Sequence, residues 1–147
     1  MTAINHVLVV FERSRAGRRA VELAAAHADE HGARITVAIV IPYERRTYGC
    51  CIRSAHWNLL LDEVALEEIA IARDMLDGRE PSPGFEIVPA EGDEALAAVV
   101  ERLGCDLVLM PKRRWGGGRI IRRLRDSTRA EVQAVAAAWS RSVHTSD

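Results

Sequence analysis

The stretch that decides the fold runs from Leu107 to Arg129 and reads LVLMPKRRWGGGRIIRRLRDSTR. It begins as a compact apolar run, passes through the triplet Gly116 to Gly118, and continues with apolar residues at helical spacing, Ile120 and Leu124 among them. A strand that enters a helix through glycines places free backbone N–H groups beside the positive end of the helix dipole. The stretch therefore predicts a strand–turn–helix unit whose turn binds an anion, most plausibly a phosphate.

Basic side chains cluster around this turn. Eight of the twenty Lys and Arg residues fall between Lys112 and Arg129, although the formal net charge of the chain is −1. Attraction to a polyanion must therefore be local. Arg113, Arg114 and Arg119 flank the turn most closely and are the predicted anion ligands, whereas the remaining arginines of the helix are expected to form a solvated face.

Apolar runs and helical patterns alternate along the rest of the chain. The patterns predict strands at 4–11, 34–41, 85–88, 106–110 and 131–139, and helices at 17–31, 57–77, 94–103 and 119–128. Gly32, Gly78 and Gly104 are expected to end the first three helices. Residues 43–55 have no clean period and are expected to be a loop, within an insertion at about 42–56 that can form a lid.

This alternation predicts an α/β fold for residues 1–147 as a single domain. The expected architecture has three layers, α/β/α, around a five-stranded, mostly parallel, doubly wound sheet. Ligands of such sheets bind beyond the carboxyl ends of the strands, at the point where the strand order reverses. Glu12, Val40 and the loop after Met110 are expected to lie along that edge.

Composition narrows the class of protein. The chain has 147 residues, 48% of them hydrophobic and 28% charged, which fits one globular domain. Residues 1–6 carry no basic flank, so we expect no signal peptide, and no apolar run approaches the roughly 20 residues that span a bilayer. The three cysteines then indicate reduced thiols in the cytoplasm.

Cysteines and histidines give no clear metal motif. Cys50 and Cys51 are neighbours, too close for an unstrained disulfide, and are expected to pack under the loop, while Cys105 is expected to be a core thiol. His27 and His31 share a helix face, but Glu30 between them does not give the zinc-protease order His-Glu-x-x-His. We expect helix-surface histidines and no metal site.

In the order of several motifs, the sequence resembles the universal stress protein family. The segments that carry the resemblance are VLVVFERS at 7–14, AVELA at 20–24, ARITV at 33–37, EGD at 91–93 and GCDLVLMP at 104–111. It covers nearly the whole chain except 42–56. The resemblance implies a five-stranded parallel sheet, cytoplasmic location and a homodimer through the last strand, where Ala134, Ala136, Ala137 and Ala138 are small enough for close approach.

Members that bind ATP carry Gly-x2-Gly-x9-Gly-Ser/Thr after the fourth strand, and this chain departs from that pattern. If Pro111 and Arg114 take the first two positions, both glycines are lost and the third falls near Leu124. If Gly116 is the second glycine, the motif ends at Asp126 and Ser127, with an acid where a phosphate would approach.

A third register takes Gly118 and Arg119 as the final Gly-Ser pair and deletes most of the loop. We prefer it, because it leaves 119–128 as the last helix and the following residues as the fifth strand. The resemblance further implies that Glu12 replaces the usual aspartate and that Val40 contacts adenine through its backbone. The predicted binding residues are Glu12, Val40, Arg113, Arg114, Gly116, Gly117, Gly118 and Arg119.

No nucleophile elbow or Ser-His-Asp spacing is present, so no catalytic residue is predicted. The leading hypothesis is a non-enzymatic, dimeric stress-response or sensor module with a small phosphorylated ligand or nucleotide at the glycine turn. The alternative is an ATP- or AMP-binding protein with weak hydrolase activity, in which Glu12 or Asp126 supports a metal. Nucleic-acid binding through the basic helix at 119–129 is the weakest hypothesis, because the net charge is near zero.

Overall fold

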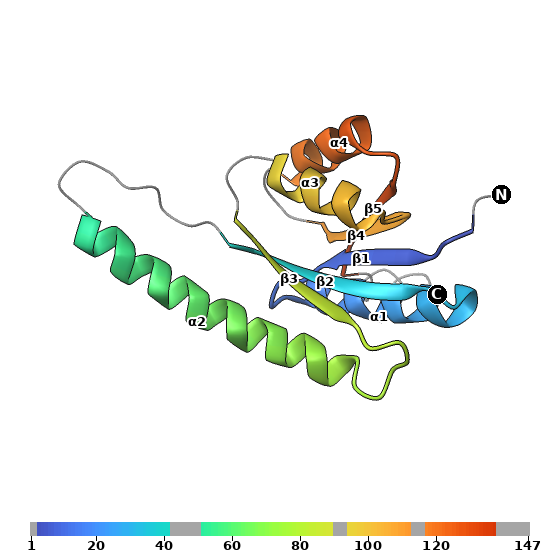
Figure 1. Ribbon diagram of the computed structural model, residues 1–147, viewed down its shortest axis with the longest axis horizontal. Helices are drawn as coiled ribbons and strands as arrows, with labels where there is room; N and C mark the ends of the chain where they lie inside the picture. Colours follow the sequence, from blue (N-terminus) through green and yellow to red (C-terminus); the bar gives the residue numbers. More distant parts are fainter. Residues whose placement is uncertain (1–2, 42–50, 90–93, 113–116, 138–147) are drawn as a thin grey trace, which may run out of the picture.

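Strands and helices alternate strictly in the residues that the computed structural model describes, 3–41, 51–89, 94–112 and 117–137 (Figure 1). In chain order the elements are β1 (His6–Val10), α1 (Arg15–His31), β2 (Arg34–Ile41), α2 (Cys51–Met75), β3 (Gly84–Pro89), α3 (Glu94–Leu103), β4 (Leu107–Pro111), α4 (Gly117–Ser127) and β5 (Glu131–Val135).

The strands form one sheet in the order β3-β2-β1-β4-β5, and every neighbouring pair is parallel. Val9 of β1, for example, is aligned with Val37 of β2 on one side and with Leu109 of β4 on the other. The predicted parallel, five-stranded α/β sheet is thereby confirmed.

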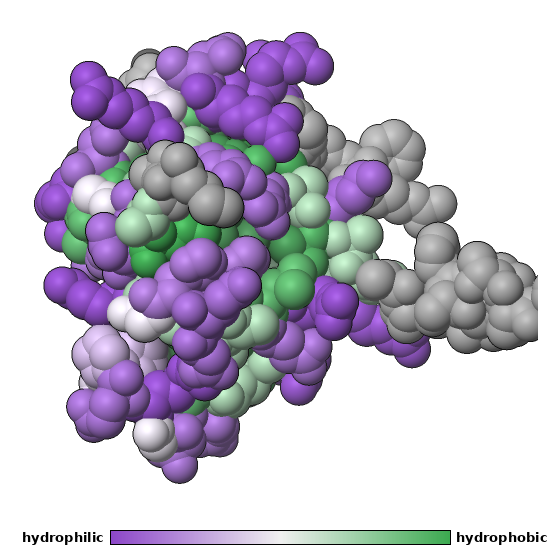
Figure 2. All heavy atoms as spheres, turned by 90° about the vertical axis from the view of Figure 1, so that its right-hand side faces the viewer, coloured by the Kyte–Doolittle hydropathy of each residue, from purple (hydrophilic) through white to green (hydrophobic). Residues whose placement is uncertain are grey.

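Helices cover both faces of the sheet. Alternate residues of β1 point to opposite faces, so Val7 and Val9 pack with α1 and α2, whereas Leu8 and Val10 pack with α3 and α4. All four side chains are essentially inaccessible to solvent. Figure 2 shows the resulting distribution, with hydrophilic side chains over the outer elements and apolar ones gathered between the layers.

The predicted helix stops are also present. Gly32, Gly78 and Gly104 adopt φ values of 67°, 79° and 64°, in the left-handed region that glycine enters without steric cost. Gly32 caps α1, and its N–H donates to the Ala28 carbonyl. These glycines turn each chain segment back toward the next strand.

α2 begins earlier than the sequence indicated. The helix starts at Cys51, so the prediction of a loop was wrong for 51–55, and residues 42–50 lie outside the described part of the chain. With 25 residues α2 is about 37 Å long, whereas the eight residues of β2 span about 26 Å. Figure 1 shows its amino-terminal part reaching well past the carboxyl end of β2.

Apolar side chains are exposed on α2, and Leu59 and Leu66 are 63% and 61% exposed. The spacing of apolar residues predicts that Val64, Ala65 and Ala72 face inward, but Val64 is 45% exposed. Ala65 and Ala72 are buried, as this spacing predicts. Val64 lies about 100° around the helix from Ala65, so the two side chains cannot both point at the same sheet.

Candidate functional site

The strand order reverses between β1 and β4. These strands are neighbours, yet α1 leaves β1 toward one face of the sheet and α4 leaves β4 toward the other. In open parallel sheets, ligands bind beyond the carboxyl ends of two strands that diverge in this way. We call this region, between the ends of β1 and β4, the crevice. The fold thus puts the candidate site where the alternation of elements predicted it.

The described residues include five of the eight predicted contacts. Glu12 follows β1 and Val40 lies near the end of β2, and both are partly buried. Gly117, Gly118 and Arg119 form the first turn of α4, whose leading N–H groups have no partner within the helix. Arg113, Arg114 and Gly116 lie outside the described residues, as does Trp115. Ligand contact by these eight residues stays a prediction.

The bounds of α4 decide between the three registers of the glycine motif. Asp126 and Ser127 form the carboxyl-terminal end of the helix, about 13 Å along its axis from Gly117. Leu124 is fully buried in the core. Neither place suits a phosphate contact, so the third register, with Gly118 and Arg119 at the helix start, is the one that fits.

The turn between β1 and α1 is held rigidly. Ser14 caps α1, because its Oγ accepts from the Gly17 N–H at 3.0 Å. The same hydroxyl donates to Glu12 Oε2 at 2.9 Å, and the Ser14 N–H donates to the Glu12 carbonyl at 2.8 Å. A Cβ on Gly17 would lie 2.0 Å from that carbonyl oxygen. Only glycine allows this approach of helix to strand.

Acidic residues of α2 reach the same turn. The Arg13 N–H donates to Glu68 Oε2 at 3.1 Å, and its guanidinium pairs with Glu67 at 3.1 Å. Burial raises the pKa of the Glu68 carboxyl, the Arg13 backbone N–H and guanidinium act against this rise, and the Glu12 carboxylate adds to it. The carboxylates of Glu12, Glu67 and Glu68 therefore lie around Arg13 at this turn, which sequence reasoning missed because only the fold brings 67–68 beside Arg13.

The α4 side is basic, but one of its arginines has a structural partner. Arg125 donates to the Val132 carbonyl through Nη2 at 2.7 Å and through Nε at 3.2 Å. The Glu131 N–H donates to the Asp106 carbonyl and the Val135 carbonyl accepts from the Lys112 N–H, so both residues bond toward β4. Because successive residues of a strand alternate in direction, the Val132 carbonyl points away from β4, to the open edge of β5. Arg125 thus covers an edge carbonyl and is not part of a purely solvated face.

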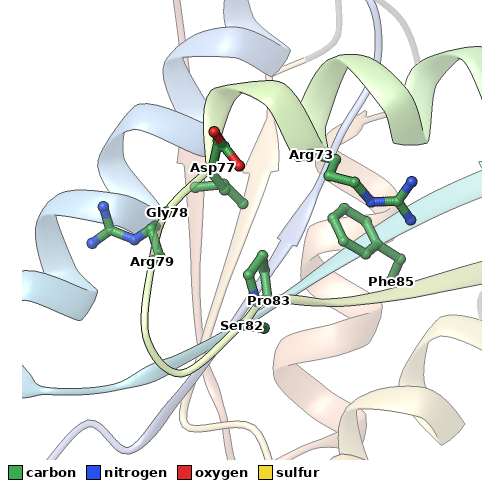
Figure 3. Close-up of a pocket in the computed structure, with 8 residues that line it drawn as sticks. Arg73, Asp77, Gly78, Arg79, Ser82, Pro83 and Phe85 are labelled. Atoms are coloured by element: carbon green, nitrogen blue, oxygen red, sulfur yellow. The ribbon is translucent and has the colours of Figure 1, made fainter.

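A pocket of about 200 Å³ lies at the opposite edge of the sheet, at the turn between α2 and β3 (Figure 3). Its two guanidinium groups are already engaged: Arg73 lies over the Phe85 ring, 4.9 Å from the centroid, and Arg79 bonds to Asp29 and to the Ala25 carbonyl. The pocket is a feature of this turn and contains none of the predicted contacts.

The Cys105 thiol is buried, as predicted. Burial raises its pKa to about 12, with a further contribution from the Asp106 carboxylate. A thiol that stays protonated is a poor nucleophile and metal ligand. The side chains of Cys50 and Cys51 lie outside the described residues.

Comparison with models of protein families identifies the family of this chain. The model of the universal stress protein family matches residues 3–133. The chain belongs to the universal stress protein family. Among curated protein sequences, none matches the chain at a significant level.

Solved universal stress proteins share the fold. One from Burkholderia pseudomallei is 18% identical, with a TM-score of 0.67 over 92% of this chain and 98% of that one. One from Archaeoglobus fulgidus, in complex with dAMP, is 18% identical, with a TM-score of 0.57 over 91% and 99%. One from Arabidopsis thaliana, with AMP bound, is 12% identical, with a TM-score of 0.66 over 90% and 91%. Within the described residues, no helix has the length and apolarity needed to cross a membrane.

Proposed function

We propose that residues 1–147 form one universal stress protein domain that acts in the cytoplasm as a non-enzymatic, dimeric sensor module. Its ligand would be a small phosphorylated molecule of the adenine nucleotide class, bound in the crevice between β1 and β4. The observation that carries the proposal is the start of α4 at Gly117, directly beside the strand-order reversal.

Charge would orient the ligand within the crevice. Phosphate oxygens match the free N–H groups of the first turn of α4 and the Arg119 guanidinium. The Glu12 carboxylate would repel phosphate but can accept hydrogen bonds from ribose hydroxyls. The nucleoside would then lie toward Glu12 and Val40, and the phosphates toward Arg119. The AMP and dAMP named with the two family members above support this ligand class.

The hydrolase alternative is less well supported. It needs a carboxylate that holds a metal beside the phosphates, and Asp126 lies at the far end of α4. The Glu12 carboxylate already accepts from Ser14, which caps α1. We therefore propose binding without turnover.

Calorimetric titration of the full chain with AMP, ATP and cyclic AMP tests the ligand. We expect submillimolar affinity for at least one of them, weakened about tenfold in Arg119→Ala by loss of a charge-assisted hydrogen bond. Arg129→Ala is the matched control, because it removes an exposed arginine beyond the other end of α4. Absence of heat with all three nucleotides would reject the ligand and leave a scaffold without one.

The dimer is proposed to form through β5. It is an edge strand, Ala134 is exposed on it, and Ala136, which follows its last residue, is exposed as well. Arg125 already donates to the Val132 carbonyl, so the hydrogen bonds between the β5 strands of two chains would have to centre on Ala134. Light scattering after size exclusion should give twice the chain mass at micromolar concentration, and a monomer at that concentration would reject this part.

A further inference from the structure

Three potential metal ligands converge at the last turn of α1. His27 and His31 are one helical turn apart and share a face, and Glu30 lies beside His31. One donor atom from each of the three lies within 4.8 Å of the other two. The two imidazole rings are nearly parallel, at 14°, with centroids 6.3 Å apart, and Glu30 Oε2 lies 3.6 Å from His31 Nε2.

His27 is not held by a structural hydrogen bond at its buried nitrogen. Its Nδ1 is inaccessible to solvent and has no hydrogen-bond partner in the described part of the chain. His6 shows the contrasting, satisfied arrangement, since its Nε2 lies 2.7 Å from Thr36 Oγ1. A buried, unpaired ring nitrogen costs free energy, and among the described residues no hydrogen bond to Nδ1 fixes the orientation of the His27 ring.

The local electrostatics favour a cation. α1 ends at His31, so the negative end of its dipole lies at this turn. Arg79 pairs with Asp29 on another face of the helix and leaves the Glu30 carboxylate beside His31. The Glu30 and His31 side chains are 70% and 35% exposed, so an ion can arrive without any opening of the fold.

We propose that His27, Glu30 and His31 bind a divalent first-row transition metal, with Zn²⁺ as the representative ion. Imidazole nitrogens with one carboxylate suit zinc, cobalt, nickel and copper, whereas magnesium and calcium take oxygen ligands. Tetrahedral coordination needs donors about 3.3 to 3.5 Å apart, so small side-chain rotations close the site. The fourth position would hold water. The site lies at the amino edge of the sheet and does not depend on nucleotide binding.

The test is calorimetric titration of the full, reduced chain with Zn²⁺. We expect one ion per chain at this site, at least about tenfold weaker binding in His31→Gln and in His27→Gln, and a smaller loss in Glu30→Gln. Both Glu30 and His31 are exposed, so their variants should fold. Glu22→Gln is the matched control, an exposed glutamate of the same helix outside the cluster, and should bind as the unaltered chain does.

Co²⁺ absorption separates this site from the cysteines. Coordination by nitrogen and oxygen gives weak visible bands without thiolate-to-cobalt charge transfer. Thiolate charge transfer, or Zn²⁺ affinity unchanged in both His27→Gln and His31→Gln, would overturn the proposal, as would the absence of any zinc binding. A zinc-dependent rise in Tm that disappears in His31→Gln would support it independently.

Discussion

The connections between helices and strands differ between the amino edge of the sheet, where the parallel strands begin, and the carboxyl edge, where they end. At the amino edge three of the four connections are short: residues 32–33, 104–106 and 128–130 join helices to strands. At the carboxyl edge the connections are longer: 11–14, 42–50, 90–93 and 112–116. Asp106 also bonds β1 and β4 together at the amino edge, since its Oδ2 accepts from the Asn5 and His6 N–H groups at 2.7 and 3.0 Å.

The difference separates the edge that is held together by its connections from the edge at which we propose that a ligand binds. Short, hydrogen-bonded connections fix the strands at one edge, which leaves the other edge free to carry glycines, charges and a projecting helix. The turn at Glu12 to Gly17 is the exception, because it is as tightly fixed as anything at the amino edge. Substitutions at each edge test this difference in stability.

The largest effect is expected for Gly17→Ala, at the carboxyl edge. The new methyl group would lie 2.0 Å from the Glu12 carbonyl oxygen, so strand or helix must move. We expect a loss of at least about 3 kcal/mol in the free energy of unfolding, measured by urea titration.

Gly84→Ala is the control for the glycine substitution itself. A Cβ there would lie 3.4 Å from Thr36 Oγ1, an ordinary contact, so stability should change by less than about 1 kcal/mol. Equal losses of stability in the two variants would show that Gly17 does not lie as close to the Glu12 carbonyl as the structure places it.

A smaller loss is expected for Asp106→Ala, at the amino edge. Removal of the carboxylate leaves two backbone N–H groups without this acceptor and should lower the free energy of unfolding by about 1–2 kcal/mol, because the Asn5 hydrogen bond is exposed and the His6 one only partly buried. Asp106→Asn keeps one carbonyl acceptor and should lose less. If neither variant is destabilised, the amino edge does not depend on Asp106.

The smallest effect concerns pH. Burial lowers the pKa of His6, as does the nearby Arg34 charge, while a backbone hydrogen bond with Leu103 and the Asp106 carboxylate act against them. The unfolded chain therefore takes up a proton before the folded one does. The contribution of His6 to the free energy of unfolding is therefore complete above pH 6.5, the ordinary pKa of the unfolded chain. It is lost as the pH falls from 6.5 through the lowered pKa of the folded chain.

His6→Gln should flatten that part of the stability profile, measured by urea unfolding at several pH values. Because other histidines also titrate, the comparison is between the slopes of the two proteins. Equal slopes would mean that His6 titrates alike in the folded and unfolded chain.

The fold was predictable because its signals are local. Apolar runs such as 107–110 mark buried parallel strands, and Gly32 and Gly104 end helices at the residues where they adopt positive φ. The start of α2 was not predictable in this way. Residues 51–55 show no helical period in the sequence, although the helix begins at Cys51.

The sequence predicted which segments meet at the carboxyl edge but not the contacts between their side chains; that a ligand binds there stays a prediction. Parallel strands bring Glu12 and the segment after Met110 to one edge by topology alone. The approach of Glu68 to Arg13 and of Arg125 to Val132 depends on side-chain reach across elements, which sequence spacing does not encode. The same holds for the buried Nδ1 of His27, which has no hydrogen-bond partner among the described residues, whereas spacing alone predicted a surface histidine.

The central strand has consequences for synthesis. β1 pairs with β2 about 28 residues along the chain, but with β4 only about 100 residues along. At roughly 5–20 residues per second, the ribosome completes β4 on the order of 4–14 s after β2. During that interval the nascent protein presents an apolar strand whose second neighbour does not yet exist, so shielding by a chaperone would matter most between those two moments.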